Sequence, residues 1–181
     1  INKYLKKNFI ISKSLKTYLK NNTFNQKIDL NPKKIIVDLT VDQPNYLLGN
    51  LILAKYLQSL NKYNIIGLIP HYFCFKTKKI AKSFSIDNFE YIDKRYISYK
   101  YKNINIKDKP PKNIEEYINF EYNGIKVGDL IYDTYLRSSG NGTVDSIKDL
   151  DEYFLLMTKY YHHYRKMIER YDVKYFITGH I

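Results

Sequence analysis

Apolar residues follow two different spacings along this chain, and the change from one to the other predicts strands followed by helices. Ile35 to Val41 is a short and almost wholly apolar run, which is typical of a buried strand in a parallel sheet. Apolar residues at helical spacing follow from Asn45 to Leu60, and a second apolar run covers Ile65 to Ile69. A strand, a helix and a strand of these lengths form a βαβ unit, which requires parallel strands.

Residues that favour turns, helix caps and helix ends indicate where these elements begin and end. Asn31-Pro32 is a turn signal ahead of the first strand. Asp42 is suited to cap the following helix, Pro44 suits its first turn, and Asn61 is expected to end it.

The pattern after residue 70 is less regular. It predicts a short helix from Thr77 to Phe84, a strand from Phe89 to Ile92 and a loop with short extended pieces over 94–113. A short helix from Ile114 to Phe120 is expected next, then a segment from Glu121 to Val127 with a turn at Asn123-Gly124, and later a loop from Ser138 to Thr143.

The clearest helix comes near the end of the chain. Ser146 and Asp149 resemble a capping box, and apolar or aromatic residues then recur at helical spacing as far as residue 171. Asp172 is expected to end this helix, and Val173 to Thr178 predicts a final strand. Strands that alternate with helices predict an α/β fold, here a Rossmann-like three-layer domain with a mainly parallel sheet.

Charge separates the first part of the chain from the rest. The net charge is +12, and residues 1–34 hold nine Lys and one Asp. We therefore distinguish a basic amphipathic segment, 1–33, from a Rossmann-like domain, 34–181. Apolar residues at roughly helical spacing in 1–22 fit a helix on an anionic membrane surface, and they fit a helix packed on the protein's own core equally well.

The composition also bears on the compartment. A single cysteine, Cys74, excludes an internal disulfide framework and fits a reducing environment. The sequence has neither an apolar run of membrane-spanning length nor a signal peptide pattern, so we expect a cytoplasmic protein. The chain stops at Ile181, where a strand runs into its loop, so we expect a domain truncated at its carboxyl end.

The stretch Asn123 to Arg137, read NGIKVGDLIYDTYLR, is the richest in candidate chemistry. Asp129, Asp133 and Arg137 are spaced four apart, so on a helix all three lie along one side. The apolar residues expected to bury the opposite side are Ile125, Val127, Leu130, Ile131 and Leu136. A buried face can hold the charged groups still, as a site requires. A solvated helix with one intrahelical ion pair has the same spacing, and both interpretations stay open.

Positions after the strands supply further candidates. Ligands of open α/β sheets bind outside the carboxyl ends of the strands, where Asp42, His71 and His180 fall. A histidine titrates near neutral pH, so His180 is suited to act as a base or to bind an anion.

Other patterns are interpreted as structural. The sequence has neither a dinucleotide fingerprint nor a phosphate-binding Gly-Lys-Ser/Thr loop. Asp149 and Asp151 match an Asp-x-Asp metal motif only superficially, because they stand at a helix start. His162 and His163 are adjacent and point to different sides of a helix, so we expect no metal site. Tyr132 and Tyr135 are expected to serve mainly the structure.

Three stretches together resemble a known family. VDLTVDQPNYLLGNLILAKYL, GIKVGDLIYDTYLR and YFITGHI are similar to parts of bacterial surface-polysaccharide glycosyltransferases, the capsule and lipopolysaccharide-type enzymes of the two-Rossmann-domain (GT-B) architecture. The resemblance covers roughly 34–181, and its most specific part is GIKVGDLIYDTYLR.

The resemblance implies the amino-terminal, acceptor-side half of an enzyme that transfers a sugar from a nucleotide-activated donor to a glycan without a bound metal. It implies no cofactor held by this half. It puts six residues on the list of candidate site residues by position and assigns them no roles: Gly128, Asp129, Tyr132, Asp133, Arg137 and His180. By their chemistry, Asp129, Asp133 and His180 are the candidate catalytic residues. The candidate substrate-binding residues are Gly128, Tyr132, Arg137, Asp42 and Asn45. Lipid-linked acceptors are common for such enzymes, which gives the basic segment a use at the inner face of the cytoplasmic membrane.

Two other functions compete with this one. A nucleic-acid-binding module is suggested by the +12 charge and 20 tyrosines, but the charge gathers at one end and no RNA or DNA motif is present. A non-catalytic Rossmann-like interaction domain in polysaccharide assembly is the other alternative.

Overall fold

The computed structural model describes residues 31–179, apart from residues 73, 105–108, 141–142 and 145. Its contacts divide the chain into two compact units. The sheet unit contains the residues up to Tyr96 and those from Met167 onwards, and the helical unit is Ile97–Lys166. The hydropathy pattern gives no indication of this division. The predicted basic segment, 1–33, lies outside the described residues except for its last three.

The sheet unit is built on a four-stranded sheet in the order β3-β2-β1-β6, in which every neighbouring pair is parallel. Its strands are β1 (Asn31–Asp38), β2 (Tyr63–Ile69), β3 (Phe89–Tyr91) and β6 (Val173–Ile177). The predicted α/β fold with a mainly parallel sheet is therefore confirmed. The arrangement is consistent with a Rossmann-like fold.

Strand β1 differs from its predicted range at both ends. It begins at Asn31 and ends at Asp38, so Asn31-Pro32 lies within the strand and the predicted turn is wrong. The pairing with β2 shifts its register between Asn31 and Lys34, which accommodates a proline that has no N–H to donate. Ile35, Ile36 and Val37 are fully buried, and because alternate side chains leave opposite faces, both faces of this strand are covered.

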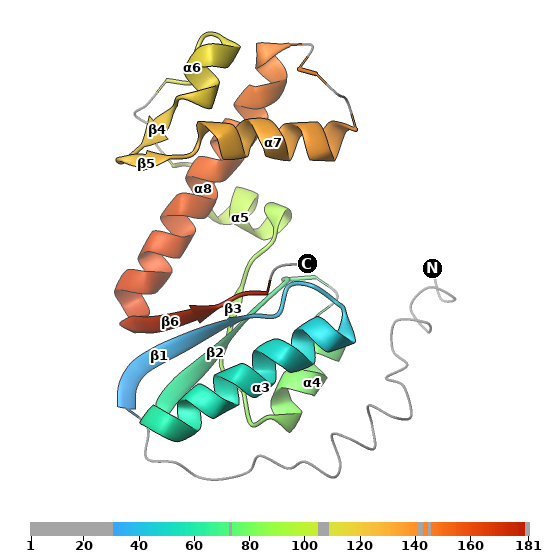
Figure 1. The fold of residues 1–181 in the computed structure, drawn as a ribbon, viewed down its shortest axis with the longest axis vertical. Helices are drawn as coiled ribbons and strands as arrows, with labels where there is room; N and C mark the ends of the chain where they lie inside the picture. Colours follow the sequence, from blue (N-terminus) through green and yellow to red (C-terminus); the bar gives the residue numbers. More distant parts are fainter. Residues whose placement is uncertain (1–30, 73, 105–108, 141–142, 145, 180–181) are drawn as a thin grey trace, which may run out of the picture. The chain divides into compact units, whose positions relative to one another are not determined.

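One face of the sheet is covered by two helices, α3 (Pro44–Asn61) and α4 (Phe75–Ser83) (Figure 1). The core between them is mostly aliphatic and includes Ile35, Val37, Leu47, Leu51 and Ile80. Helix α3 begins at Pro44 and ends at Asn61, as those residues predict.

Helix α5 (Lys94–Lys100) replaces part of the loop predicted over 94–113. Asp93 Oδ1 accepts a 2.8 Å hydrogen bond from the backbone N–H of Tyr96, which is the bond expected of a helix cap. The alternation of tyrosine and lysine concealed this helix, because aromatic and cationic residues give no clear apolar stripe.

Besides the end of α5, the helical unit contains three helices and a hairpin within its described residues. They are α6 (Ile114–Ile118), β4 (Glu121–Tyr122), β5 (Ile125–Lys126), α7 (Gly128–Ser139) and most of α8 (Ile147–Tyr171). Asn123 and Gly124 both have positive φ angles, 50° and 76°, which confirms the turn predicted there. The predicted loop from Ser138 begins later, because α7 continues to Ser139 and ends at Gly140 with a left-handed conformation.

Tyrosines dominate the core of the helical unit. Tyr117, Tyr122 and Tyr135 are buried together with Phe154 and Leu150 of α8. Each buried hydroxyl reaches a polar group on α8: Tyr117 donates to Asp151, Tyr135 to Asp149 at 3.4 Å, and Tyr122 shares a 3.0 Å bond with His162. Asp149 and Asp151 therefore serve the structure, as their place at a helix start predicted.

Candidate functional site

The strand order places a topological switch point between β1 and β6. From β1 the chain passes to β2 and then β3 on one side, whereas β6 pairs with β1 on the other. Ligands of open α/β sheets bind in the crevice outside the carboxyl ends of the strands at such a point. The residues that follow β1 and β6 are therefore the best placed to form a site.

A hydrogen-bonded cluster centred on Asp38 joins the ends of these two strands. One carboxylate oxygen accepts bonds from the backbone N–H and the hydroxyl of Thr40, at 2.9 and 2.7 Å. The other accepts bonds from the hydroxyls of Tyr46 and Thr178, at 3.0 and 3.1 Å. The side-chain amide of Asn50 donates to the Asp38 carbonyl at 2.9 Å. Because four donors occupy its carboxylate, Asp38 fixes the ends of β1, β6 and α3 and is poorly suited to act as a base.

The backbone that leads into His180 is held to this cluster. The N–H of Gly179 donates to the Tyr46 hydroxyl at 3.2 Å. A Cβ atom at position 179 would lie 2.4 Å from the Tyr46 ring, so this close approach requires glycine. His180 lies outside the described residues, and its predicted place beside the switch point stays a prediction.

Asp42 and Asn45 follow β1 at the same edge of the sheet. Asp42 lies 2.8 Å from the ammonium of Lys76, at the start of α4. The amino-terminal cap of α3 is Gln43, without a side-chain bond, so the predicted capping role of Asp42 is wrong: its carboxylate binds Lys76 instead. Asn45 is exposed in the first turn of α3. The edge thus presents a carboxylate, an ammonium and an amide to a ligand.

Aromatic side chains gather at the ends of β2 and β3. The His71 ring stacks on Tyr96, with 5.2 Å between centroids and 14° between planes. Tyr72 and Tyr91 approach the same imidazole edge-on, at 4.7 and 5.1 Å. The sequence indicated His71 as a candidate because it follows a strand, but it did not indicate the tyrosines. Tyr91 ends a strand and Tyr96 lies in a helix that the sequence did not predict.

The stretch with most of the predicted site residues forms α7, in the helical unit. Asp129, Asp133 and Arg137 are all exposed, as their common spacing allows. Arg137 Nε lies 2.8 Å from Asp133 Oδ2, and the two side chains are 79% and 54% exposed. An i,i+4 pair in water stabilises a helix by only a few tenths of a kcal/mol. An anion that binds Arg137 has to replace Asp133 as its partner.

The buried side of α7 differs in part from the prediction. Val127 and Ile131 are buried, but Leu130 is 61% exposed and Ile125 is 51% exposed. Tyr135 takes their place in the core. The spacing alone could not distinguish an aliphatic side chain that faces the core from one that lines a groove.

Gly128 and Tyr132 have structural surroundings in this unit. A Cβ atom on Gly128 would lie 1.6 Å from the carbonyl oxygen of Tyr117, so only glycine fits here. The Gly128 N–H donates to the carbonyl of Phe120 at 3.1 Å. Tyr132 is partly buried and packs against the tyrosine core, in the structural role expected for it.

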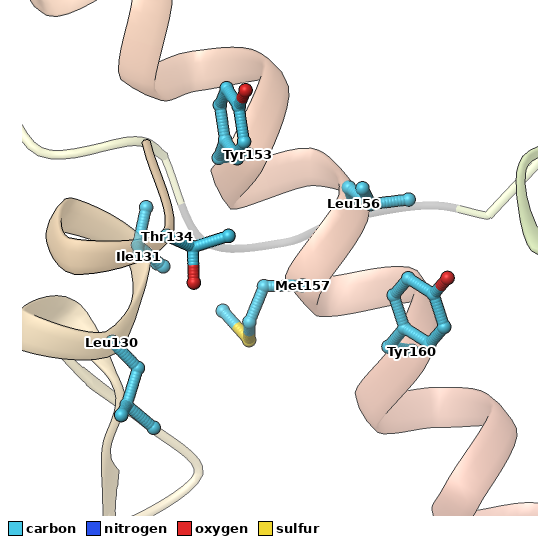
Figure 2. A pocket seen from close by; sticks show the side chains of 7 residues that line it. All are labelled: Leu130, Ile131, Thr134, Tyr153, Leu156, Met157 and Tyr160. Atoms are coloured by element: carbon cyan, nitrogen blue, oxygen red, sulfur yellow. The ribbon is translucent and has the colours of Figure 1, made fainter. Parts of the chain in front are cut away.

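A groove of about 230 Å³ lies between α7 and α8 (Figure 2). It is lined by Leu130, Ile131, Thr134, Tyr153, Leu156, Met157 and Tyr160. Met157 projects from α8 toward α7, between the two helices (Figure 2). The lining is mainly apolar, and no carboxylate or cation belongs to it, so the groove suits apolar contact rather than acid–base chemistry.

Burial perturbs the pKa values of several titratable groups. Burial, with the hydrogen bond to Asp151 second, raises the pKa of Tyr117. Burial and the bond to Glu90 raise the pKa of Tyr171 to about 12. Burial lowers the pKa of His162, and Lys166 and Arg165 add to the effect. These groups are therefore uncharged at neutral pH, which suits packing and hydrogen bonding.

The predicted site residues belong to two different units. Asp42 and Asn45 lie at the carboxyl edge of the sheet unit, whereas Gly128, Asp129, Tyr132, Asp133 and Arg137 belong to the helical unit. Within the described residues, no three His, Cys, Asp or Glu side chains are grouped so that they could hold a metal ion. No helix in that part of the chain is both long enough and apolar enough to cross a membrane.

Comparisons of the chain with models of protein families, with curated proteins and with solved structures gave no significant match.

Proposed function

We propose that this chain is the acceptor-side domain of a metal-independent glycosyltransferase with two Rossmann-like domains, the GT-B architecture. Its reaction is the transfer of a sugar from a nucleotide-activated donor to a cell-surface polysaccharide. The observation that carries the proposal is the polar switch point, where Asp38, Tyr46 and Thr178 join the ends of β1 and β6. The resemblance of residues 34–181 to such enzymes supports it independently.

In the proposed reaction, a hydroxyl oxygen of the acceptor attacks the anomeric carbon of the donor sugar. The bond from that carbon to the diphosphate breaks, and the nucleoside diphosphate leaves with the electron pair. A base on the enzyme takes the proton of the attacking hydroxyl. Cationic side chains and helix amino termini stabilise the leaving diphosphate.

Among the candidate bases, we propose His180. Asp38 already accepts four hydrogen bonds, and Asp133 is paired with Arg137. A neutral imidazole is a competent base near pH 7, and the residue before it is fixed to Tyr46. Asp42 and Asn45 are proposed to bind sugar hydroxyls, and Asp129 is the alternative base.

The proposal includes a cellular place. Nucleotide-activated sugars are cytoplasmic substrates, so the enzyme is proposed to work in the cytoplasm. Residues 1–34, with nine Lys and one Asp, are proposed to contact the anionic inner face of the membrane, where lipid-linked acceptors are presented.

The test is a transfer assay on the protein expressed from its complete coding sequence. The protein is incubated with a panel of nucleotide sugars and with glycan extracted from the source organism, and released nucleoside diphosphate is measured. We expect His180→Ala to lower the turnover number by about a hundred-fold or more, since that is the usual contribution of a general base. We expect Asp42→Asn mainly to raise KM for the acceptor.

Asp87→Asn is the matched control, because Asp87 is an exposed carboxylate of the sheet unit away from the carboxyl edge. It should leave both constants unchanged. Folded protein that releases no nucleotide from any donor contradicts the proposal. So does a His180→Ala variant with full turnover.

A non-catalytic interaction domain is the second candidate, and the groove between α7 and α8 favours it. This alternative predicts that Leu130→Asp abolishes association with a polysaccharide-assembly partner, whereas His180→Ala has no effect. The transferase proposal predicts that His180→Ala lowers sugar transfer much more than Leu130→Asp does.

A further inference from the structure

The aromatic cluster at the ends of β2 and β3 has features that core packing does not require. Its members are His71, Tyr72, Tyr91 and Tyr96, and Phe75 follows in the chain at the start of α4. Tyr72 is 48% exposed and Phe75 is 71% exposed, and His71 is exposed as well. Single exposed aromatic residues are common, but neighbouring ones at the ligand-binding edge of an α/β sheet indicate a recognition surface.

Hydrogen bonds with Asp93 and Lys78 hold the cluster in place. The two carboxylate oxygens of Asp93 accept separate bonds, from the N–H of His71 at 2.7 Å and from the N–H of Tyr96 at 2.8 Å. One side chain therefore fixes both the loop after β2 and the start of α5. Lys78 adds a third tie, because its ammonium donates to the Tyr91 hydroxyl at 2.8 Å. These bonds fix the backbone that carries His71 and Tyr96 and the ring of Tyr91, so this part of the surface loses little entropy when a ligand binds.

The charge around these rings is positive. The guanidinium of Arg95 lies 5.9 Å from the centre of the Tyr72 ring, and the Lys78 ammonium lies 4.9 Å from that of Tyr91. The hydrogen bond to Tyr91 raises the pKa of Lys78, which keeps that cation charged. The carboxylate of Asp93, which holds the cluster, is occupied by two N–H groups. A ligand with a ring and a negative charge fits this surface.

The negative charge is better supplied by a carboxylate than by a diphosphate. Diphosphates are usually held by glycine-rich loops, where backbone N–H groups can approach the phosphate closely. The segment between β2 and α4 reads PHYFC and has no glycine. A single guanidinium forms two parallel hydrogen bonds with a carboxylate and with a phosphate alike, so the preference for a carboxylate rests on the missing glycine.

We propose that Tyr72 and Arg95, on the scaffold of His71, Tyr91 and Tyr96, bind an acidic sugar unit of the acceptor glycan. The C–H face of the sugar ring packs on the Tyr72 ring, and the sugar carboxylate pairs with Arg95. This inference rests on the proposed function, because it takes a glycan as the acceptor, and it adds the chemical class of that glycan, one that contains uronic acid or a similar acidic sugar.

The test measures binding alone and does not depend on transfer. The full chain is titrated with two acidic probes, tetragalacturonate and a hyaluronan tetrasaccharide, and with neutral maltotetraose, by saturation-transfer NMR and calorimetry. We expect at least one acidic probe to bind more tightly than maltotetraose. Tyr72→Leu and Arg95→Gln should each raise its dissociation constant by roughly ten-fold, because each removes one of the two anchoring contacts.

Matched controls separate this surface from the general charge and aromaticity of the chain. Tyr56 is 59% exposed on α3, and Lys82 is an exposed cation in the last turn of α4. Tyr56→Leu and Lys82→Gln should leave the dissociation constant unchanged. Circular dichroism of all four variants shows whether each still folds.

The inference is overturned if neither acidic probe binds, or if maltotetraose binds as tightly as the acidic probes. It is also overturned if Tyr72→Leu and Arg95→Gln have the dissociation constant of the parent. A third contrary result is that uridine monophosphate competes for Tyr72 more strongly than the acidic probes do. Binding without any sugar transfer would leave a glycan-binding domain and remove the transferase proposal. Transfer without acidic-glycan binding would remove this inference alone.

Discussion

The two units bury different kinds of side chain. In the sheet unit the core is mostly aliphatic, with Ile35, Val37, Leu47 and Leu51 at no exposure. In the helical unit four buried tyrosines have hydroxyls that bond to α8: Tyr101, Tyr117, Tyr122 and Tyr135. One core is held together by contact area, and the other adds directed hydrogen bonds.

This difference changes what each core tolerates. An aliphatic core accepts another apolar residue of similar volume at small cost. A buried hydroxyl needs its partner, and a partner left without its donor also loses stability. The helical unit is therefore expected to be more specific in its side chains, and the sheet unit more sensitive to lost volume.

The largest expected effect is a cavity in the aliphatic core. Leu51→Ala should lower the free energy of unfolding by roughly 2–5 kcal/mol, since it removes buried methyl groups and leaves a void. Hydrogen exchange followed by mass spectrometry should show the loss of protection mainly in sheet-unit peptides. Leu53→Ala, at a position 46% exposed on the same helix, is the control and should cost much less. Equal loss in both units would mean that they unfold together.

A steric substitution in the helical unit comes next. Gly128→Ala should destabilise by about 3 kcal/mol, because the new Cβ meets the Tyr117 carbonyl oxygen and forces the backbone apart. Gly49→Ala is the matched control, because nothing lies within 4 Å of its Cβ position in α3. That change should stabilise the protein by roughly 0.5–1 kcal/mol. Denaturant titration measures the free energy of unfolding of both variants. A shift in the same direction for Gly128→Ala and Gly49→Ala would contradict this prediction.

A Tyr→Phe substitution removes one hydroxyl hydrogen bond of the tyrosine core at a time. Tyr117→Phe keeps the ring but leaves Asp151 without its hydroxyl donor, and should cost about 1–2 kcal/mol. Tyr56→Phe, on an exposed ring of α3, should change stability negligibly. If both variants unfold at the same denaturant concentration as the parent, hydrogen bonding adds nothing to the tyrosine core.

The sequence indicated the sheet more fully than the site. The strands at Ile35 and Ile65 could be predicted because a run of aliphatic residues requires burial whatever it packs against. Helix α5 could not, because its cap, Asp93, precedes a segment of mixed tyrosine and lysine. The Asp38 cluster was missed because one of its donors, Thr178, lies 140 residues away in the chain. For α7 the spacing placed three charges on one side, but not whether that side meets solvent.

Alkaline pH tests one tyrosine of each unit. The pKa of Tyr171, in the sheet unit, is raised to about 12, and that of Tyr117, in the helical unit, is raised as well. The folded protein keeps these protons more tightly than the unfolded chain, so their contribution is complete below about pH 10 and is lost as pH rises through the folded values. Unfolding measured from pH 9 to 12 should show this decline, and Tyr171→Phe should make it shallower. A flat profile would contradict the raised pKa values.

The smallest expected effect concerns the exposed charged face of α7. Asp133→Asn removes the pair with Arg137 and should change the unfolding free energy by less than about 0.5 kcal/mol. The difference should shrink further in 1 M salt, because screening weakens exposed pairs. If thermal unfolding shows a loss of stability several times larger, the ion pair stabilises the helix more than an exposed pair is expected to.

The pairing of β1 with β6 has a consequence for biosynthesis. Strand β1 is made before the helical unit, which is continuous in sequence, and its neighbour β6 emerges from the ribosome only after that unit. The helical unit can thus fold while β1 still has one unpaired edge. During that interval the nascent chain exposes an aliphatic strand, which is the kind of segment that holdase chaperones bind and that aggregates when synthesis outpaces folding.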